Sequence, residues 1–248
     1  MKKIIIITSN IQLIKMPKKQ LPNKLIPISC SDKEGWSESW KPGRNILNIP
    51  HPFRLVAIGP PSSGKSTAIK NIIVRAKPKF KEIIVAHLDP EGSHEWEDCD
   101  AKMISELPEP TSFDRKKKRL LIIEDLNLKE LSKQNKARLN RLMGYTSSHC
   151  NLSIAITCQA AFDLSPSIRR MANLFIIFKQ IDISSLVTLA SRLGLKKEHM
   201  LLIMARLLPN CHDSLWIDVS RSSPAPYRIN GFNPVTLTEL DAAVKSLK

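Results

Sequence analysis

From residue 45 onward the chain alternates short apolar runs with longer stretches in which apolar residues recur every three or four positions. The run at 120–123 has no polar position, which is typical of a strand whose two faces are both covered by helices. Strands that alternate with helices predict βαβ units and a mostly parallel sheet flanked by helices. The expected strands lie at 54–58, 82–88, 120–123, 152–157 and 174–178, with two more near 216–219 and 227–229.

The stretches between these runs predict the covering helices. Pro78 ends the first of them, because proline lacks the amide that a helix interior needs. Gly194 suits the position after a helix end, and the last helix begins at a capping box formed by Thr236 and Glu239. The expected helices lie at 65–76, 128–143, 184–193 and 196–208, and a further one is expected around 99–107.

Residues 1–44 differ from the rest and are expected to form an N-terminal extension, either flexible or used to dock a partner. The apolar run near its start holds only four Ile, fewer than the roughly 7–15 residues of a secretory signal core. No apolar run approaches the roughly 18 residues that cross a bilayer, so we expect no membrane partner. We further expect a core domain at 45–220 and a C-terminal strand and helix at 221–248.

Basic residues outnumber acidic ones by 38 to 23, which gives a formal net charge of +15. This excess favours a polyanionic partner such as nucleic acid, because neutralising phosphates releases counterions; a solvated basic surface explains it equally well. Two basic clusters stand out, the run 116–119 before an expected strand, and Lys129, Lys133 and Lys136 on one face of an expected helix. Taken singly, each cluster is more typical of solvated surface than of a DNA contact.

A phosphate-binding loop lies between the first expected strand and the first expected helix. Residues 59–67 match the complete pattern G-x-x-x-x-G-K-[S/T]. Its glycines let successive backbone N–H groups turn toward an anion, and the helix N-terminus adds its positive end. Lys65 would reach the β- and γ-phosphates, and the Ser66 hydroxyl would face Mg²⁺. We expect ATP, whose base the loop does not identify, to contact Gly59, Pro60, Pro61, Ser62, Ser63, Gly64, Lys65, Ser66 and Thr67.

An acidic pair, Glu124 and Asp125, comes directly after the apolar run 120–123. Ligands of open parallel sheets bind at the carboxyl ends of the strands, and a phosphate loop needs a carboxylate there to hold the Mg²⁺ shell and direct the attacking water. By position Glu124 would face Mg²⁺ and Asp125 would orient or deprotonate the water, although the two roles can be exchanged. The alternative is an acidic pair that caps the following helix.

Missing motifs narrow the class of protein. A GTPase needs Asn-Lys-x-Asp to read guanine, whereas here Asn135-Lys136-Ala137 is followed by Arg138. The sequence also lacks the Leu-Ser-Gly-Gly-Gln signature of transporter ATPases and a full set of helicase motifs after the acidic pair. A nucleotide or small-molecule kinase is not excluded by these absences.

Three stretches share the pattern of one family. The first runs from His51 through the phosphate loop, the second is the strand 153–158 with Gln159 at its end, and the third is the segment 168–179 with its two arginines. Together they resemble the FtsK/HerA-superfamily DNA-packaging ATPases of large DNA viruses and virophages, over roughly residues 50–180. The departure is Glu124, where that family commonly has Asp.

The resemblance implies a RecA-like or FtsK/HerA-like P-loop NTPase fold and a role for each matched residue. Gln159 would hydrogen-bond the attacking water or the γ-phosphate. Arg169 resembles the finger that crosses a subunit boundary to stabilise charge on the transferred phosphoryl group, with Arg170 as the second candidate. A finger in trans requires a head-to-tail oligomer, and the family implies a ring, commonly a hexamer, around double-stranded DNA. The alternatives are a polar strand end for Gln159 and plain surface cations for the arginines.

The phosphate loop and the acidic pair predict Mg²⁺-dependent binding and hydrolysis of ATP, and the resemblance implies a motor that packages viral double-stranded DNA. Its partners would be DNA, further copies of the chain, and capsid or portal proteins, in the host cytoplasm at a viral factory or in the virion. Five scattered cysteines without a C-x-x-C pair are typical of reduced thiols in an intracellular compartment. Two other classes stay open, a P-loop kinase that works without DNA and an assembly protein that binds ATP and DNA without hydrolysis.

Overall fold

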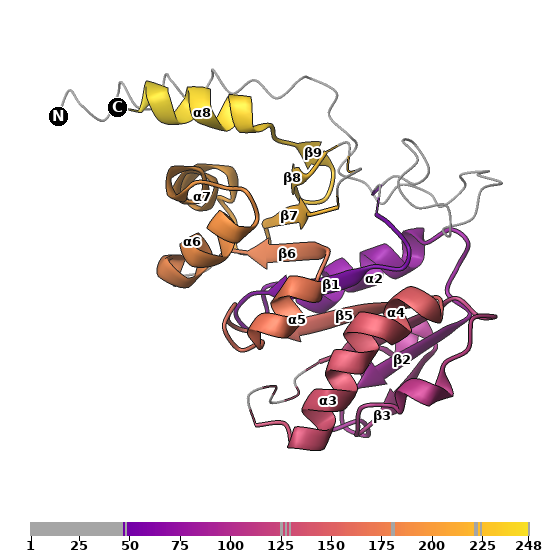
Figure 1. Ribbon diagram of the computed structural model, residues 1–248. Helices are drawn as coiled ribbons and strands as arrows, with labels where there is room; N and C mark the ends of the chain where they lie inside the picture. The colour runs from indigo at the N-terminus through magenta and orange to yellow at the C-terminus, as the bar shows by residue number, and fades with distance from the viewer. Residues whose placement is uncertain are drawn as a thin grey trace.

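One sheet runs through the described part of the chain (Figure 1), with nine strands in the order β3-β2-β4-β5-β1-β6-β7-β8-β9. The computed structural model describes residues 47, 49–124, 126, 128, 130–179, 182–220, 223 and 225–247. The expected extension 1–44, Asp125 and Lys129 lie outside these residues. The strands are β1 (Arg54–Ile58), β2 (Glu82–Ala86), β3 (Ala101–Ile104), β4 (Arg119–Ile123), β5 (Leu152–Cys158), β6 (Leu174–Phe178), β7 (Ser214–Asp218), β8 (Tyr227–Ile229) and β9 (Asn233–Pro234).

The sheet is parallel from β3 to β6, and β7, β8 and β9 continue it in antiparallel pairs. β1 lies between β5 and β6, and β5 separates β1 from β4. Because β1, β4 and β5 are parallel, their carboxyl ends lie at one edge of the sheet. The segments that follow β1, β4 and β5 are therefore brought together, and the predicted mostly parallel sheet is confirmed.

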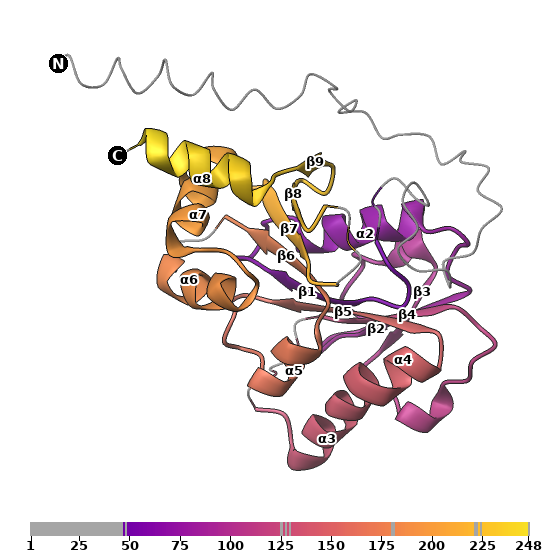
Figure 2. The ribbon, with the colours of Figure 1, turned by 45° about the horizontal axis from the view of Figure 1, so that its top comes forward.

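Helices cover both faces of the sheet (Figure 2). The first, α2 (Lys65–Arg75), lies on one face and the later helices on the other. π-Helical segments at Leu142–Thr146 and Ile203–Leu207 continue α3 and α7. No helix in the ranges given above is long and apolar enough to span a membrane. The later helices are α3 (Lys133–Arg141), α4 (Ser147–His149), α5 (Pro166–Met171), α6 (Ile183–Arg192), α7 (Lys197–Leu202) and α8 (Leu237–Ser246).

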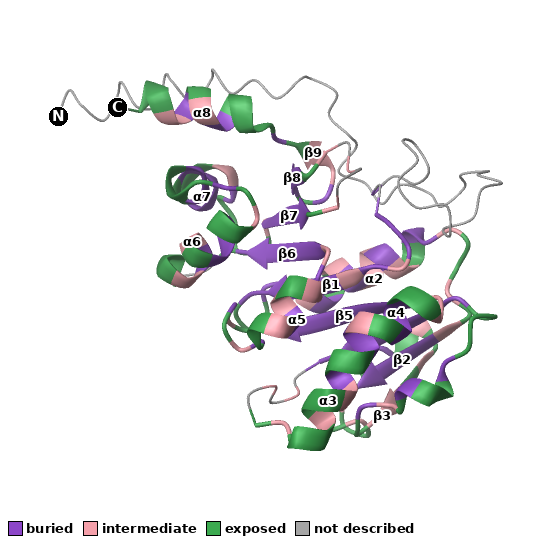
Figure 3. Ribbon diagram, viewed as in Figure 1, coloured by how far each residue is buried: buried purple, intermediate pink, exposed green. Residues whose placement is uncertain are grey.

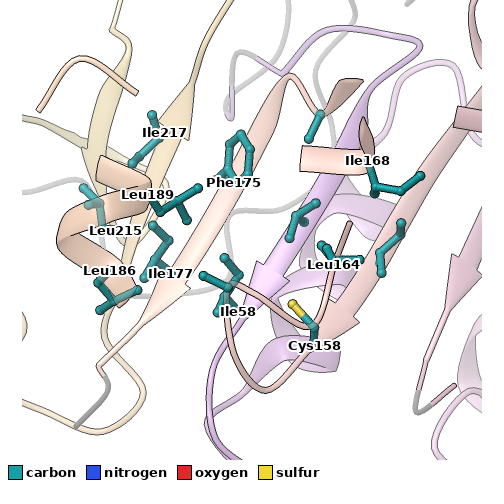
Figure 4. Close-up of a cluster of buried hydrophobic side chains, with 14 of the residues drawn as sticks. Ile58, Cys158, Leu164, Ile168, Phe175, Ile177, Leu186, Leu189, Leu215 and Ile217 are labelled. Atoms are coloured by element: carbon teal, nitrogen blue, oxygen red, sulfur yellow. The ribbon is translucent and has the colours of Figure 1, made fainter. Parts of the chain in front are cut away.

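The central strands are buried on both faces, as Figure 3 shows for β5 and β6. Ile58 of β1 and Phe175 of β6 pack in one apolar cluster with Leu186 and Leu189 of α6 (Figure 4). Full burial of such a side chain contributes about 1.5–3 kcal/mol. Ala57, the residue before Ile58, belongs to a second apolar cluster on the face covered by α2. The continuous apolar runs of the sequence therefore place side chains in the cores on both faces of the sheet.

Three sequence predictions need correction. The helix expected at 99–107 is a short 3-10 turn, Glu97–Cys99, followed by strand β3, because Asp100 adopts a left-handed φ of 51° and breaks the helix. The helix expected to begin at 128 begins at Lys133, where the Ser132 side chain caps it by accepting from the Asn135 amide. The basic run 116–119 is not all surface, since its last two residues, Lys118 and Arg119, are buried.

Candidate nucleotide site

The phosphate loop follows β1 and is tied to the sheet. The Gly59 amide donates to the Cys158 carbonyl at the end of β5, over 3.1 Å. A Cβ on Gly59 would lie 2.8 Å from the Phe178 Cβ, so the loop reaches this depth only with glycine. Ser62 and Gly64 have left-handed φ angles of 59° and 100°. Left-handed residues in such a loop make the concave turns in which backbone N–H groups converge on an anion.

Lys65 begins α2 and lies across the loop. Its Nζ donates to the carbonyl oxygens of Gly59, over 2.9 Å, and Pro60, over 2.8 Å. The ammonium is therefore held beside the turn that is expected to receive phosphate. Its flexible four-carbon side chain would let it move to a bound phosphate.

Ser66 and Glu124 are in direct contact. The Ser66 hydroxyl donates to Glu124 Oε1 over 2.6 Å, and the Glu124 amide donates to the Ala86 carbonyl over 3.0 Å. Glu124 is only 4% exposed. The structure therefore joins the predicted loop to one member of the predicted acidic pair, although β5 lies between their strands.

Trp96 completes the surroundings of the Glu124 carboxylate. This residue is buried in the connection from β2 to β3, and its indole Nε1 donates to Glu124 Oε2 over 2.5 Å. Each carboxylate oxygen thus has a protein donor, which fixes the orientation of the group. Trp96 is a candidate site residue that sequence reasoning missed; its one signal is a lone Trp in an otherwise polar connection.

Gln159 and Asp163 follow β5 and line a cavity of about 1140 Å³ together with Lys65, Ser66 and Glu124. Gln159 is exposed. Asp163, which sequence reasoning also missed, accepts from the Ala160 amide over 2.8 Å and so shapes the turn behind Gln159. The predicted glutamine therefore borders the same cavity as the predicted lysine, serine and glutamate.

The two arginines lie on α5 and have different surroundings. The Arg169 guanidinium donates to the carbonyls of Leu164, over 2.5 Å, and Ala161, over 3.3 Å, and stacks over the Phe162 ring at 4.5 Å from its centre. Arg170 is exposed. Neither lines the cavity of its own chain. Arg169 is thus engaged with the loop behind Gln159, whereas Arg170 faces solvent.

The C-terminal strands supply the remaining wall of the cavity. His212, just before β7, donates from Nδ1 to the Ser63 carbonyl over 3.2 Å, and Phe232, between β8 and β9, lines the same cavity. Sequence reasoning assigned neither residue to the site, because both are more than a hundred residues away from the phosphate loop in the sequence.

No protein-family model and no curated protein matches the chain. Solved structures do match it. The crystal structure of B204, the DNA-packaging ATPase from Sulfolobus turreted icosahedral virus, is 18% identical with a TM-score of 0.55, over 76% of this chain and 100% of that one.

The genome packaging NTPase B204 from Sulfolobus turreted icosahedral virus 2 also matches. Its complex with AMPPCP is 20% identical with a TM-score of 0.53, over 74% of this chain and 98% of that one. Its complex with ATP-gammaS is 19% identical with a TM-score of 0.52, over the same shares. The chain therefore shares its fold with these viral packaging NTPases, and the predicted P-loop NTPase fold is confirmed.

Proposed function

We propose that the protein hydrolyses ATP at this site and uses the energy to move duplex DNA. The observation that carries the proposal is the hydrogen bond between Ser66 of the phosphate loop and Glu124 at the end of β4. It places a hydroxyl and a carboxylate beside the turn that would hold the phosphates. The shared fold of B204, solved in complex with AMPPCP and ATP-gammaS, supports nucleotide binding.

The same two side chains suit Mg²⁺. Magnesium takes oxygen ligands, keeps several of its waters and needs only one or two protein groups beside the phosphates. Ser66 Oγ and Glu124 Oε1 offer adjacent oxygens, and Trp96 holds the other carboxylate oxygen in place. Bound there, Mg²⁺ would neutralise charge on the β- and γ-phosphates.

The remaining residues divide the work of hydrolysis. Lys65 would exchange the Gly59 and Pro60 carbonyls for the β- and γ-phosphate oxygens, which are stronger acceptors for an ammonium. Gln159, at the end of the strand between β1 and β4, would position the attacking water in line with the γ-phosphate. Asp125 follows Glu124 and would take the proton of that water.

We assign the arginine finger to Arg170. A finger must leave its own subunit, and the Arg169 guanidinium already donates to two carbonyls of its own chain. Arg170 is exposed in the last turn of α5 and free to reach a neighbouring site. A finger in trans requires copies arranged head to tail, which supports a ring, with a hexamer as the expected size.

Double-stranded DNA is the proposed track. The chain carries a net charge of +15, and Lys133, Lys136 and Arg141 are exposed on α3. A basic surface binds duplex phosphates by releasing counterions. The fold shared with a DNA-packaging ATPase supports genome packaging as the purpose, with a capsid or portal protein as docking partner and a viral factory or the virion as the location.

The proposal is tested by phosphate release from ATP with and without linear duplex DNA. Wild type should be stimulated by DNA, and Lys65→Ala should lose turnover under both conditions. Mixing Arg170→Ala with Lys65→Ala should restore part of the activity, because some boundaries then combine an intact loop with an intact finger. Transfer of phosphate to a small acceptor without a response to DNA would identify a kinase instead.

A further inference from the structure

We propose that the cavity contains a site for a purine base between α2 and the tip of the β8–β9 hairpin, with the Phe232 ring as a stacking platform. The inference rests on the proposed function, because it states how the nucleotide of that site is recognised. The phosphate loop specifies a triphosphate, whereas the platform would bind the base.

The direction of the bound nucleotide follows from the hydrolytic groups. Glu124 and Gln159 follow β4 and β5, so the γ-phosphate must lie toward those strands. The nucleoside then extends the opposite way, past Thr67 and Asn71 of α2, which line the same cavity. The volume of about 1140 Å³ is sufficient, since ligand pockets commonly measure roughly 300–1,000 Å³.

A tight turn brings Phe232 to this end of the cavity. Asn230 and Gly231 have left-handed φ angles of 53° and 77°, and the Phe232 amide donates to the Ile229 carbonyl over 3.2 Å. Asn-Gly is the sequence pair that best tolerates two such angles in a hairpin turn. A Cβ on Gly231 would lie 3.2 Å from the Trp216 ring, so glycine also lets the turn rest on the indole.

The turn is anchored to β7 by the side chain and backbone of Asn230. Its Oδ1 accepts from the Ser214 amide over 2.8 Å, its Nδ2 donates to Asp213 Oδ1 over 2.8 Å, and its amide donates to the Ser214 carbonyl over 2.8 Å. The turn that carries Phe232 is therefore held in one position before ligand arrives, which lowers the entropic cost of binding. Because the side-chain amide of Asn230 already makes these hydrogen bonds, we do not expect it to recognise the base.

The surroundings of Phe232 suit a flat, apolar ligand. The ring is half-buried and packs against the apolar cluster that includes Leu47 and Trp216, both of which line the cavity. On α2, Asn71 donates to the Thr67 carbonyl and accepts from the Arg75 guanidinium. This guanidinium lies over the Phe232 ring, 5.8 Å from its centre, so the base would stack on the other face of the ring.

Base recognition at this platform should therefore be by stacking and should discriminate little between adenine and guanine. Both asparagines at this end of the cavity, Asn71 and Asn230, are engaged within the protein. Aromatic platforms accept every base because each has a π-face, and a larger face stacks more strongly. Purines should accordingly bind more tightly than pyrimidines.

Calorimetric titration of the full chain with AMPPCP and with inorganic triphosphate tests the proposal. Phe232→Ala should weaken AMPPCP binding about tenfold, the effect expected when an aromatic platform under a base is removed. It should leave the affinity for triphosphate unchanged, since that ligand has no base, and Phe232→Trp should bind AMPPCP as wild type does. Tyr145→Ala, at an exposed aromatic on the opposite face of the sheet, serves as the matched control and should change neither affinity.

The outcomes separate this inference from the proposed function. Unchanged AMPPCP affinity in Phe232→Ala, with both ligands lost in Lys65→Ala, overturns the base site alone. Equal losses of AMPPCP and triphosphate in Phe232→Ala also overturn it, because the ring would then support the fold of the loop. Wild-type affinity for both ligands in Lys65→Ala overturns the nucleotide site itself. A guanine analogue that binds more than about tenfold worse than AMPPCP contradicts recognition by stacking.

Discussion

Replacing Glu124 with glutamine separates the charge of the buried carboxylate from its shape. Ser66 Oγ donates to one carboxylate oxygen and Trp96 Nε1 to the other. An indole N–H can only donate, whereas a hydroxyl can also accept. Glutamine can therefore turn its oxygen to Trp96 and its amide to Ser66. Glu124→Gln keeps both hydrogen bonds and loses the negative charge and the oxygen beside Ser66.

Alanine at the same position has a different cost. Glu124→Ala leaves the buried Trp96 N–H without its acceptor, which costs about 1–3 kcal/mol. In a domain of 150–250 residues each kcal/mol lowers the Tm by about 2–4 °C, so the alanine variant should melt roughly 2–12 °C below the glutamine variant. Both should lose ATP hydrolysis by about 100-fold or more, as when one group that stabilises transition-state charge is deleted.

Thermal unfolding and phosphate release, measured on the same preparations, test both halves of this reasoning. The expected pattern is two equally inactive variants with different Tm values. Wild-type turnover in Glu124→Gln would move the essential carboxylate to Asp125 and refute the assignment of Glu124. Equal Tm values for the glutamine and alanine variants would refute the claim that the Trp96 hydrogen bond stabilises the fold.

Three further predictions concern other parts of the molecule. Arg170→Ala should abolish DNA-stimulated phosphate release at an unchanged Tm, whereas Arg169→Ala should lower the Tm because it releases the loop behind Gln159; the reverse pattern would make Arg169 the finger. Burial lowers the pKa of Lys118 from 10.5 to about 6, so the unfolded chain binds more protons between these values and the free energy of unfolding rises with pH across that window. Lys118→Met should therefore raise the Tm more at pH 6 than at pH 9, and equal gains would contradict this. Gly231→Ala should lower the free energy of unfolding by about 1–2 kcal/mol, measured by thermal melts, because alanine disfavours the left-handed φ of this position. An unchanged Tm would show that the turn relaxes.

The phosphate loop and the parallel sheet could be predicted because their signals are local. The glycines and Lys65 stand at fixed spacing, and the apolar runs need no partner to be recognised as strands. Glu124 could be placed at a strand end for the same reason. Its contact with Ser66 follows once parallel pairing with β5 brings the ends of β1 and β4 to one edge.

The features that escaped prediction depend on tertiary contacts. The strand β3 has four residues, and pairing with β2 decides its conformation where local sequence does not. Lys118 and Arg119 belong to a basic run, yet Arg119 pairs with Glu82, and Lys118 donates to the Pro78 carbonyl. No pattern in the run reveals these partners.

The residues missed around the cavity have the same explanation. Trp96 reaches Glu124 from the connection between β2 and β3, and Phe232 reaches the cavity from the far end of the chain. An isolated aromatic in a polar segment is the most that the sequence offers for either. The Asn230-Gly231 pair indicates a hairpin turn, but only the folded sheet shows that the turn lines the same cavity as the phosphate loop.

In the proposed function, ATP hydrolysis at this site moves the protein along duplex DNA. Displacement of a fluorescent third strand from linear duplex DNA measures such movement directly. Wild type with ATP should displace the strand, whereas Lys65→Ala with ATP and wild type with AMPPCP should not. ATP hydrolysis by wild type on this duplex without any displacement of the third strand would contradict the proposal. Displacement of the strand by the Lys65→Ala variant would contradict it as well.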